Sequence, residues 1–449
     1  MASEIAEVVG GQLVGDDVAV NGATIDSRSV STGQLFVPIV AARDGHDFIS
    51  AALDAGAPAY LTSAGAVDGA AGAAIIVDDT ARALAALGAA ARDRLPGRVV
   101  GVTGSVGKTS TKDLLAGLLA TTFRTAASEK SFNNELGLPL TLVNAPDDTE
   151  AVVLEMGARG IGHIDLLCSI GKPTVGIITR VEGVHLELFG NIEAVARAKG
   201  ELVEALPDDG IAVLNADHKH VAAMADRTSA RVITFGLTPE SDVHASAVVI
   251  DDELRASFRL HSPWGDTDIR LAARGEHQVP NALAAVAAAG GLGVPVEKFA
   301  EGLLGAALSG LRMELVTSER GVTILNDAYN ANPTSMSAAL QSLAALAAGR
   351  RIAVLGTMAE LGHDSAWQHE AIASQARELG IEVIAVGEPT YGADVRHVAD
   401  VAAASAELSD LGAGDAVLVK GSRVAELERV AQALLGSVSY THLRAHETR

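Results

Sequence analysis

The sequence TGSVGKT at residues 103–109 lies between an apolar segment, residues 98–102, and a helical pattern over residues 110–119. A glycine turn between a strand and a helix presents backbone N–H groups and the positive end of the helix dipole to a phosphate. Lys108 is placed to reach the terminal phosphates, and the Thr109 hydroxyl is a ligand for Mg²⁺. The longer form of this motif would have a glycine at Val102, so the match is to the shorter form. A tight strand–helix turn with an exposed lysine is the alternative.

The pattern outside this loop divides the chain into three regions. Residues 1–81 contain short strands and turns typical of a small α/β module, and residues 82–310 alternate unbroken apolar strands with helices. In residues 243–271 apolar and polar residues alternate more, which predicts an antiparallel addition to the central region. Residues 311–436 again alternate strands with helices. Unbroken apolar strands between helices indicate parallel sheets. We therefore predict a three-domain α/β fold with a small N-terminal domain, a central P-loop domain and a C-terminal Rossmann-like domain.

Residues 437–449 differ abruptly in composition from the Ala-, Leu- and Val-rich helix before them. Within this segment, the run SYTHLRAHET at residues 439–448 is similar to translated sequencing-adapter read-through. We interpret residues 437–449 as a non-native tail.

Charge and composition exclude several classes of protein. The net charge of −22 argues against binding to nucleic acids and against adhesion to anionic membranes. The single cysteine, Cys168, excludes an intrachain disulfide and fits a reducing compartment. No signal pattern and no run of about 18 apolar residues is present. We expect a monomeric, cytoplasmic protein with no membrane insertion.

Several further segments join the phosphate loop in resembling one family, the Mur ligase superfamily. The matching segments are residues 26–28, 35–38, 44–46, 103–112, 131–142, 329–336, 355–362 and 420–423. The resemblance covers residues 1–436. The run Tyr-Asn-Ala-Asn-Pro at residues 329–333 is similar to the branch that adds D-alanyl-D-alanine, and the Asp-Asn-Pro-Arg run of the diaminopimelate-adding branch is absent.

The resemblance implies an ATP-dependent ligase that activates a carboxylate as an acyl phosphate and couples it to an amine. The expected substrates are UDP-N-acetylmuramoyl-tripeptide and D-alanyl-D-alanine, the third peptide residue being diaminopimelate or lysine. A related ligase, of the folylpolyglutamate or diaminopimelate-adding type, is one alternative. A nucleotide-binding regulatory protein without catalysis is another, and the presence of Lys108, Glu155, His185 and Lys199 argues against it.

Two anionic reactants need cations, and the expected cofactors are ATP and two Mg²⁺ ions. Glu155 ends a predicted strand, where open α/β sheets place their ligands, and His185 follows the strand over residues 174–179. By resemblance both are Mg²⁺ ligands, as is Lys199 once carbamylated, since a carbamate is an anionic oxygen ligand and a bare ammonium would repel the ion. The alternatives are a helix-capping acid, an ordinary loop histidine and a helix-surface lysine. The expected catalytic and metal residues are Lys108, Thr109, Glu155, His185 and Lys199.

The resemblance also implies the remaining contacts. The expected nucleotide-binding residues are Thr103, Gly104, Ser105, Val106, Gly107, Lys108, Thr109, Ser110, Asn134, His277, Asn281, Arg312 and Asp327. The expected substrate-binding residues are Ser27, Arg28, Asp44 and His46 for the UDP-sugar peptide, and Asn330, Asn332, Lys420, Ser422 and Arg423 for the dipeptide. Three positions depart from the family pattern: Gln278 replaces an Asn, and Asn326 and Thr357 stand where acids are usual. For Asp44, a turn-forming Asp-Gly is an equal alternative.

Overall fold

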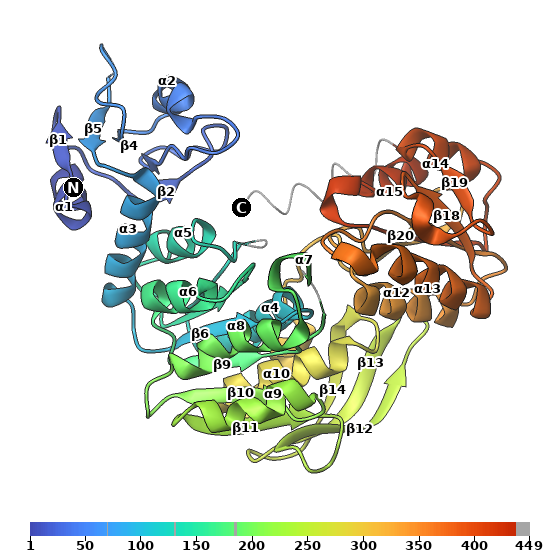
Figure 1. The fold of residues 1–449 in the computed structure, drawn as a ribbon. Coiled ribbons are helices and arrows are strands. Elements are labelled where there is room, and N and C mark those ends of the chain that lie inside the picture. Colours follow the sequence, from blue (N-terminus) through green and yellow to red (C-terminus); the bar gives the residue numbers. More distant parts are fainter. Residues whose placement is uncertain (70, 130–131, 184–185, 437–449) are drawn as a thin grey trace.

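The computed structural model describes residues 1–69, 71–129, 132–183 and 186–436. Three β-sheets follow one another along the chain, and each packs against helices (Figure 1). This arrangement confirms the predicted α/β architecture.

The first sheet has five strands in the order β1-β5-β4-β3-β2, and β1 runs antiparallel to β5. The elements of this region are α1 Ala2–Val9, β1 Gln12–Val14, β2 Ala23–Thr24, β3 Leu35–Phe36, the 3-10 helix η1 Gly45–Phe48, α2 Ile49–Asp54, β4 Ala59–Thr62, β5 Ala73–Ile76 and α3 Thr80–Arg94. The Asp79 side chain caps α3 by accepting from two backbone N–H groups of its first turn. Helix α3 buries Leu84 in the core of the first sheet and Ala91 in a core of the central sheet, so it joins the two regions.

The central sheet has nine strands in the order β14-β13-β12-β11-β10-β9-β6-β8-β7. The strands are β6 Val99–Thr103, β7 Thr125–Ala127, β8 Ala151–Glu155, β9 Val175–Ile178, β10 Ile211–Asn215, β11 Arg231–Gly236, β12 Val243–Ile250, β13 Arg255–His261 and β14 Thr267–Arg274. The helices are α4 Lys108–Ala120, α5 Gly137–Val143, α6 His163–Gly171, α7 Leu186–Phe189, α8 Ile192–Glu204, α9 Lys219–Ala222, η2 Ala223–Arg227, α10 Gln278–Gly291, η3 Val296–Lys298 and α11 Phe299–Leu304. The predicted antiparallel addition is the β12–β14 part of this same sheet.

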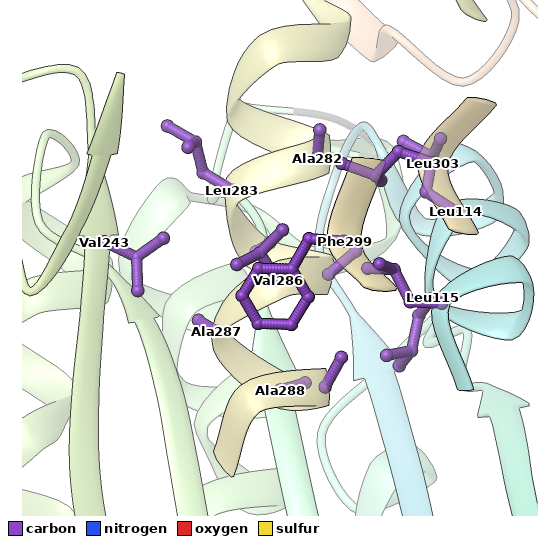
Figure 2. Packing of buried hydrophobic residues seen from close by; sticks show 14 of the residues in the cluster. Leu114, Leu115, Val243, Ala282, Leu283, Val286, Ala287, Ala288, Phe299 and Leu303 are labelled. Carbon is purple, nitrogen blue, oxygen red and sulfur yellow. The ribbon is translucent and has the colours of Figure 1, made fainter. Parts of the chain in front are cut away.

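Helix α10 is the centre of the largest core (Figure 2). Its alanines let it pack closely, and Leu283 and Val286 are fully buried in it. Phe299 and Leu303 of α11 lie beside it, together with Leu115 of α4. Because α4 begins at the phosphate loop, this core holds the loop at a fixed place above the sheet.

The third sheet has six strands in the order β15-β16-β20-β17-β18-β19. The elements are β15 Glu314–Thr317, β16 Thr323–Asn326, α12 Pro333–Ala345, β17 Arg351–Leu355, η4 Gly362–Asp364, α13 Ser365–Glu378, β18 Glu382–Val386, η5 Pro389–Tyr391, β19 Arg396–Val398, α14 Val401–Glu407, β20 Ala416–Lys420, η6 Arg423–Ala425 and α15 Glu428–Leu435. All neighbours are parallel except β15, which pairs antiparallel with β16. The short strands β1, β7, β15 and β19 were not expected from the sequence, because three or four residues show too little alternation.

The two junctions between regions differ. At the first, the Asn144 side chain pairs with both backbone groups of Ala23 at 2.9 Å each, as a strand neighbour would. At the second, Asp113 of α4 accepts from the Ser309 backbone at 2.7 Å, and the chain then turns through Leu311 and Met313 with φ of 58° and 51°. None of the described helices is long and apolar enough to cross a membrane.

Candidate active site

The phosphate loop joins β6 to α4 as predicted, and two of its glycines are required there. Gly104 has φ 152°, and a Cβ on it would lie 1.9 Å from the Thr179 hydroxyl. Gly107 has φ 86°, and its Cβ would lie 2.4 Å from Asn281 Oδ1. The Lys108 ammonium donates to the Gly104 carbonyl at 2.8 Å, so the loop folds around its own lysine.

A cleft of about 600 Å³ lies between the phosphate loop and the third sheet. It brings together most of the predicted site: Ser105, Val106, Gly107, Lys108, Thr109, Ser110, Asn134, Glu155, Lys199, His277, Asn281, Arg312, Asp327, Asn330, Asn332, Lys420, Ser422 and Arg423. Thr103 ends β6 and Gly104 begins the loop, and neither residue lines the cleft. The cleft thus brings together predicted residues that are far apart in the sequence. Lys108 and Arg312, for example, are separated by more than 200 positions.

Hard oxygen donors meet at the carboxyl end of β8. The Thr109 hydroxyl donates to Glu155 Oε2 at 2.7 Å, and the Asn133 amide donates to Glu155 Oε1 at 2.8 Å. Glu155 is 1% exposed, so it is not a surface helix cap. A hydroxyl and a carboxylate suit Mg²⁺, which is usually held by one or two carboxylates together with waters and phosphate oxygens. Within the described residues, no group of three or more His, Cys, Asp and Glu side chains is placed to hold a metal alone.

Lys199 is one of the largest fully buried side chains, at 2% exposed. This excludes the helix-surface alternative. Burial, and then the nearby charge of Lys108, lower the pKa of Lys199 well below its usual value. Both effects favour the neutral form of the Lys199 amine. Burial also lowers the pKa of Lys108.

One wall of the cleft is formed by the start of α10 and by Arg312, where the sequence predicts nucleotide binding. Burial lowers the pKa of His277, which keeps the imidazole neutral. Asn281 donates to Gln278 Oε1 at 2.9 Å. Gln278, which stands where the family pattern has Asn, therefore still holds the Asn281 side chain. Arg312 stacks over the Tyr329 ring at 4.2 Å and donates to the Thr109 hydroxyl at 2.9 Å. Arg312 therefore links the junction after Leu311 to the phosphate loop.

The third sheet supplies an ion pair that the sequence did not reveal. Lys420 ends β20 and donates to Asp327 Oδ2 at 2.5 Å and to the Asn330 carbonyl at 2.8 Å. Asp327 follows β16, which is the second strand of this sheet along the chain because the short strand β15 precedes it. Asn332 caps α12 by accepting from the Ser335 backbone at 2.9 Å, and Arg423 pairs with Glu428.

The departures Asn326 and Thr357 have structural contacts. The Asn326 amide donates to Glu314 at 3.1 Å, and the Thr357 carbonyl accepts from the Ser422 backbone at 2.9 Å. Neither residue lines the cleft.

The predicted residues of the first region lie outside this cleft. Arg28 pairs with Asp26 through two hydrogen bonds of 2.7 and 2.8 Å. Asp44 accepts from the His46 backbone at 2.9 Å and lies 2.6 Å from its Nδ1, while His46 Nε2 accepts from the Ser63 backbone at 3.1 Å. The structure thus forms two local clusters, and no hydrogen bond or ion pair between described residues links Ser27 or Arg28 to His46.

Two predictions fall on parts of the chain that the structure does not describe: His185 as a metal ligand and residues 437–449 as a tail. Other side chains at the cleft were missed. Asn133 and Tyr329 belong to the segments that resemble the family, and Arg159 and Arg180 follow buried strands, a signal that was available.

Comparisons with known proteins agree with this geometry. Family models match along the chain: the "Mur ligase family, catalytic domain" at residues 19–92, the "Mur ligase middle domain" at 102–289 and the "Mur ligase, glutamate ligase domain" at 311–423. The UDP-N-acetylmuramoyl-tripeptide–D-alanyl-D-alanine ligase of Mycobacterium tuberculosis is 40% identical, over 96% of this chain and 97% of the relative.

Solved structures give the same result. MurF from Acinetobacter baumannii has a TM-score of 0.86 and 29% identity, and covers 97% of this chain and 98% of its own. MurF ligase from Thermotoga maritima, solved in complex with ADP, has a TM-score of 0.80 and 28% identity over 94% of this chain and 98% of its own.

Together with the phosphate loop in the cleft, these matches identify the chain as an ATP-dependent peptide ligase. With matches at this identity and coverage, the chain belongs to the Mur ligase family.

Proposed function

We propose that the chain joins UDP-N-acetylmuramoyl-tripeptide to D-alanyl-D-alanine for peptidoglycan synthesis, converting ATP to ADP and phosphate. The relatives that match over nearly the whole chain have this activity in their names. The single observation that supports it most is the common cleft, in which Lys108 and Glu155 of the central sheet face Asp327 and Lys420 of the third.

The reaction has two steps. A carboxylate oxygen of the tripeptide attacks the γ-phosphorus of ATP, and ADP leaves, giving an acyl phosphate. The dipeptide amine then attacks the acyl carbon, phosphate leaves, and the amine loses a proton. Holding both reactants in one cleft contributes much of the acceleration.

The phosphate loop binds the nucleotide in this scheme. Its backbone N–H groups and the start of α4 stabilise negative charge on the phosphates. The Lys108 ammonium, which donates to the Gly104 carbonyl, is assigned to contact the γ-phosphoryl group during its transfer. Four further nucleotide-binding candidates line the cleft, and we assign His277 and Asn281 to the base, Arg312 to the phosphates and Asp327 to the ribose.

Thr109 and Glu155 are the proposed Mg²⁺ ligands, with His185 and carbamylated Lys199 serving a second ion. Bound Mg²⁺ supplies neutralisation of phosphate charge. The Lys199 side chain is buried and its pKa is lowered, which supports the carbamate because the modification needs a neutral amine. The carbamate would add an anionic oxygen ligand for the ion.

The substrate ends are assigned to opposite regions. Ser27, Arg28, Asp44 and His46 bind the UDP-sugar part, and the third region binds the dipeptide through Asn330, Asn332, Lys420, Ser422 and Arg423. These assignments accompany a division into domains at residues 1–81, 82–310 and 311–436, which the three separate sheets support. The enzyme is assigned to the cytoplasm as a monomer without membrane insertion.

The test is phosphate release by purified protein that lacks residues 437–449. ATP and UDP-N-acetylmuramoyl-tripeptide are supplied with and without D-alanyl-D-alanine, and the product is identified by mass. Release that requires both substrates, with a pentapeptide product, is expected. Turnover with a folate or a single amino acid instead would reassign the chain to a sister ligase, and nucleotide binding without any turnover would contradict the enzyme assignment.

A further inference from the structure

Seven lysine and arginine side chains line the cleft within the described residues. They are Lys108, Arg159, Arg180, Lys199, Arg312, Lys420 and Arg423. A peptide substrate with several carboxylates needs a cation that is both accessible and not already neutralised, so the partners of these seven side chains decide which of them is available.

Five of the seven are engaged by the protein. Their partners are Asp327 for Lys420, Glu428 for Arg423, Glu182 for Arg180, Thr109 and the Tyr329 ring for Arg312, and the Gly104 carbonyl for Lys108. Lys199 has no such partner, but it is buried and its pKa is lowered, so it offers no accessible charge.

Arg159 differs from the other six. It is exposed in the cleft and makes no hydrogen bond or ion pair with any described residue. It lies four positions beyond Glu155, on the loop between β8 and α6. An unpartnered guanidinium therefore stands close in sequence to the carboxylate that we assign to the metal.

The loop that carries Arg159 is fixed at both ends. On one side the Gly157 backbone donates to the Asn133 carbonyl at 2.7 Å. On the other, the Glu201 carboxylate accepts from the backbone N–H groups of Gly162, Ile164 and Asp165 at 2.6, 3.1 and 3.0 Å. Glu201 thus occupies the N-terminal donors of α6, and an anion entering here would be bound by a side chain rather than by the helix end.

The geometry points to Arg159 as the residue that binds the free carboxylate of the glutamyl residue in the peptide substrate, a carboxylate that is not phosphorylated in the reaction. This rests on the proposed function. One solved neighbour, from Acinetobacter baumannii, is named as a ligase of a peptide written alanyl-D-glutamyl-2,6-diaminopimelate. A glutamyl residue that forms one amide through one of its two carboxyl groups keeps the other free, whatever the third residue is. A guanidinium can bind that carboxylate through two parallel hydrogen bonds.

The test compares two substrates in wild-type protein and in Arg159→Gln. One is the natural tripeptide, and the other has the free glutamyl carboxylate converted to a carboxamide. Wild-type protein is expected to show a KM about 10- to 100-fold higher for the carboxamide, the usual effect of one hydrogen-bonded charge. Arg159→Gln is expected to show similar, raised KM values for both substrates, with the KM for ATP and D-alanyl-D-alanine unchanged.

Two further variants complete the design. Arg159→Lys keeps the charge without the fork and should recover part of the discrimination. Arg197→Gln removes an exposed arginine of α8 outside the cleft and should behave as wild type. If Arg159→Gln discriminates between the two substrates as wild type does, the assignment is wrong while the ligase function stands. If wild-type protein makes no pentapeptide from the natural tripeptide, the proposed function itself fails, and the assignment fails with it.

Discussion

Lys199 in the central region and Lys420 in the third region are both 2% exposed, yet their surroundings are opposite. Lys420 has the Asp327 carboxylate at 2.5 Å and a carbonyl at 2.8 Å. Lys199 makes no hydrogen bond or ion pair with a described residue, and its strongest electrostatic neighbour is another cation, Lys108. Burial alone therefore does not define the role of a lysine, and the partner does.

The consequence is that the two lysines should respond differently to removal. The charge of Lys420 is balanced by Asp327, so removing the lysine leaves the Asp327 carboxylate without a counter-charge. The surroundings of Lys199 disfavour a charged amine. Removing this lysine should therefore lower activity and also remove the free-energy cost of burying the amine.

The largest expected effect is on stability, for Lys420→Met. The variant leaves Asp327 at 14% exposure without its cation, and breaking a buried pair costs about 3–5 kcal/mol. The chain has two tryptophans, so a Trp264→Phe background leaves Trp367 of α13 to report urea unfolding of the third region. Adding Asp327→Asn to Lys420→Met should restore part of the loss. An unchanged midpoint for Lys420→Met would mean that the pair does not stabilise this region.

The next effect is on activity, for Lys199→Ala. We expect kcat to fall about 100-fold, or about 2.7 kcal/mol, if Lys199 supplies an oxygen ligand to the metal. Wild-type activity should rise when bicarbonate is added to carbon dioxide-depleted buffer, whereas the variant should not respond. Lys219→Ala, at an exposed lysine of α9, is the matched control. Full activity in Lys199→Ala would exclude the carbamate.

A smaller effect of opposite sign is expected for the stability of Lys199→Met. Methionine is similar in length and has no amine to desolvate, so the free energy of unfolding should increase by about 1–3 kcal/mol. Urea unfolding of the ligand-free protein measures it. A decrease would show that the Lys199 amine has a stabilising partner in the folded protein.

The smallest effect is a dependence of stability on pH. The folded-state pKa of Lys199 is lowered, so between that value and the ordinary lysine value the unfolded chain binds more protons than the folded one. Stability should therefore rise with pH across that window, by at most about 1.4 kcal/mol per pH unit for one proton. Lys199→Met should rise less steeply than wild type between neutral and alkaline pH, and equal slopes would contradict the depressed pKa.

The sequence was informative wherever a local pattern determines geometry. The phosphate loop, the end of β8 at Glu155 and the parallel strands follow from glycine positions and unbroken apolar runs. The burial of Lys199 was harder to predict from the sequence, because a lysine on a helix is usually exposed at the surface.

The pairing of Asp327 with Lys420 was not predictable, since 93 positions separate the two and only the adjacency of β16 and β20 joins them. The helix-capping role of Asn332 has a local signature, Asn followed by Pro, that the resemblance to a binding motif concealed. The clusters around Arg28 and His46 show that residues chosen for one ligand can form separate local groups.

The Asn144 contact with Ala23 has a consequence for contacts between molecules. Strand β2 is at the edge of the first sheet, and an open edge offers free N–H and C=O groups to the strands of other chains. Because one amide side chain occupies both groups of Ala23, the edge is closed at that residue from within the same chain. The side chain that attaches the first region to the second thereby also protects the folded protein against aggregation through this strand.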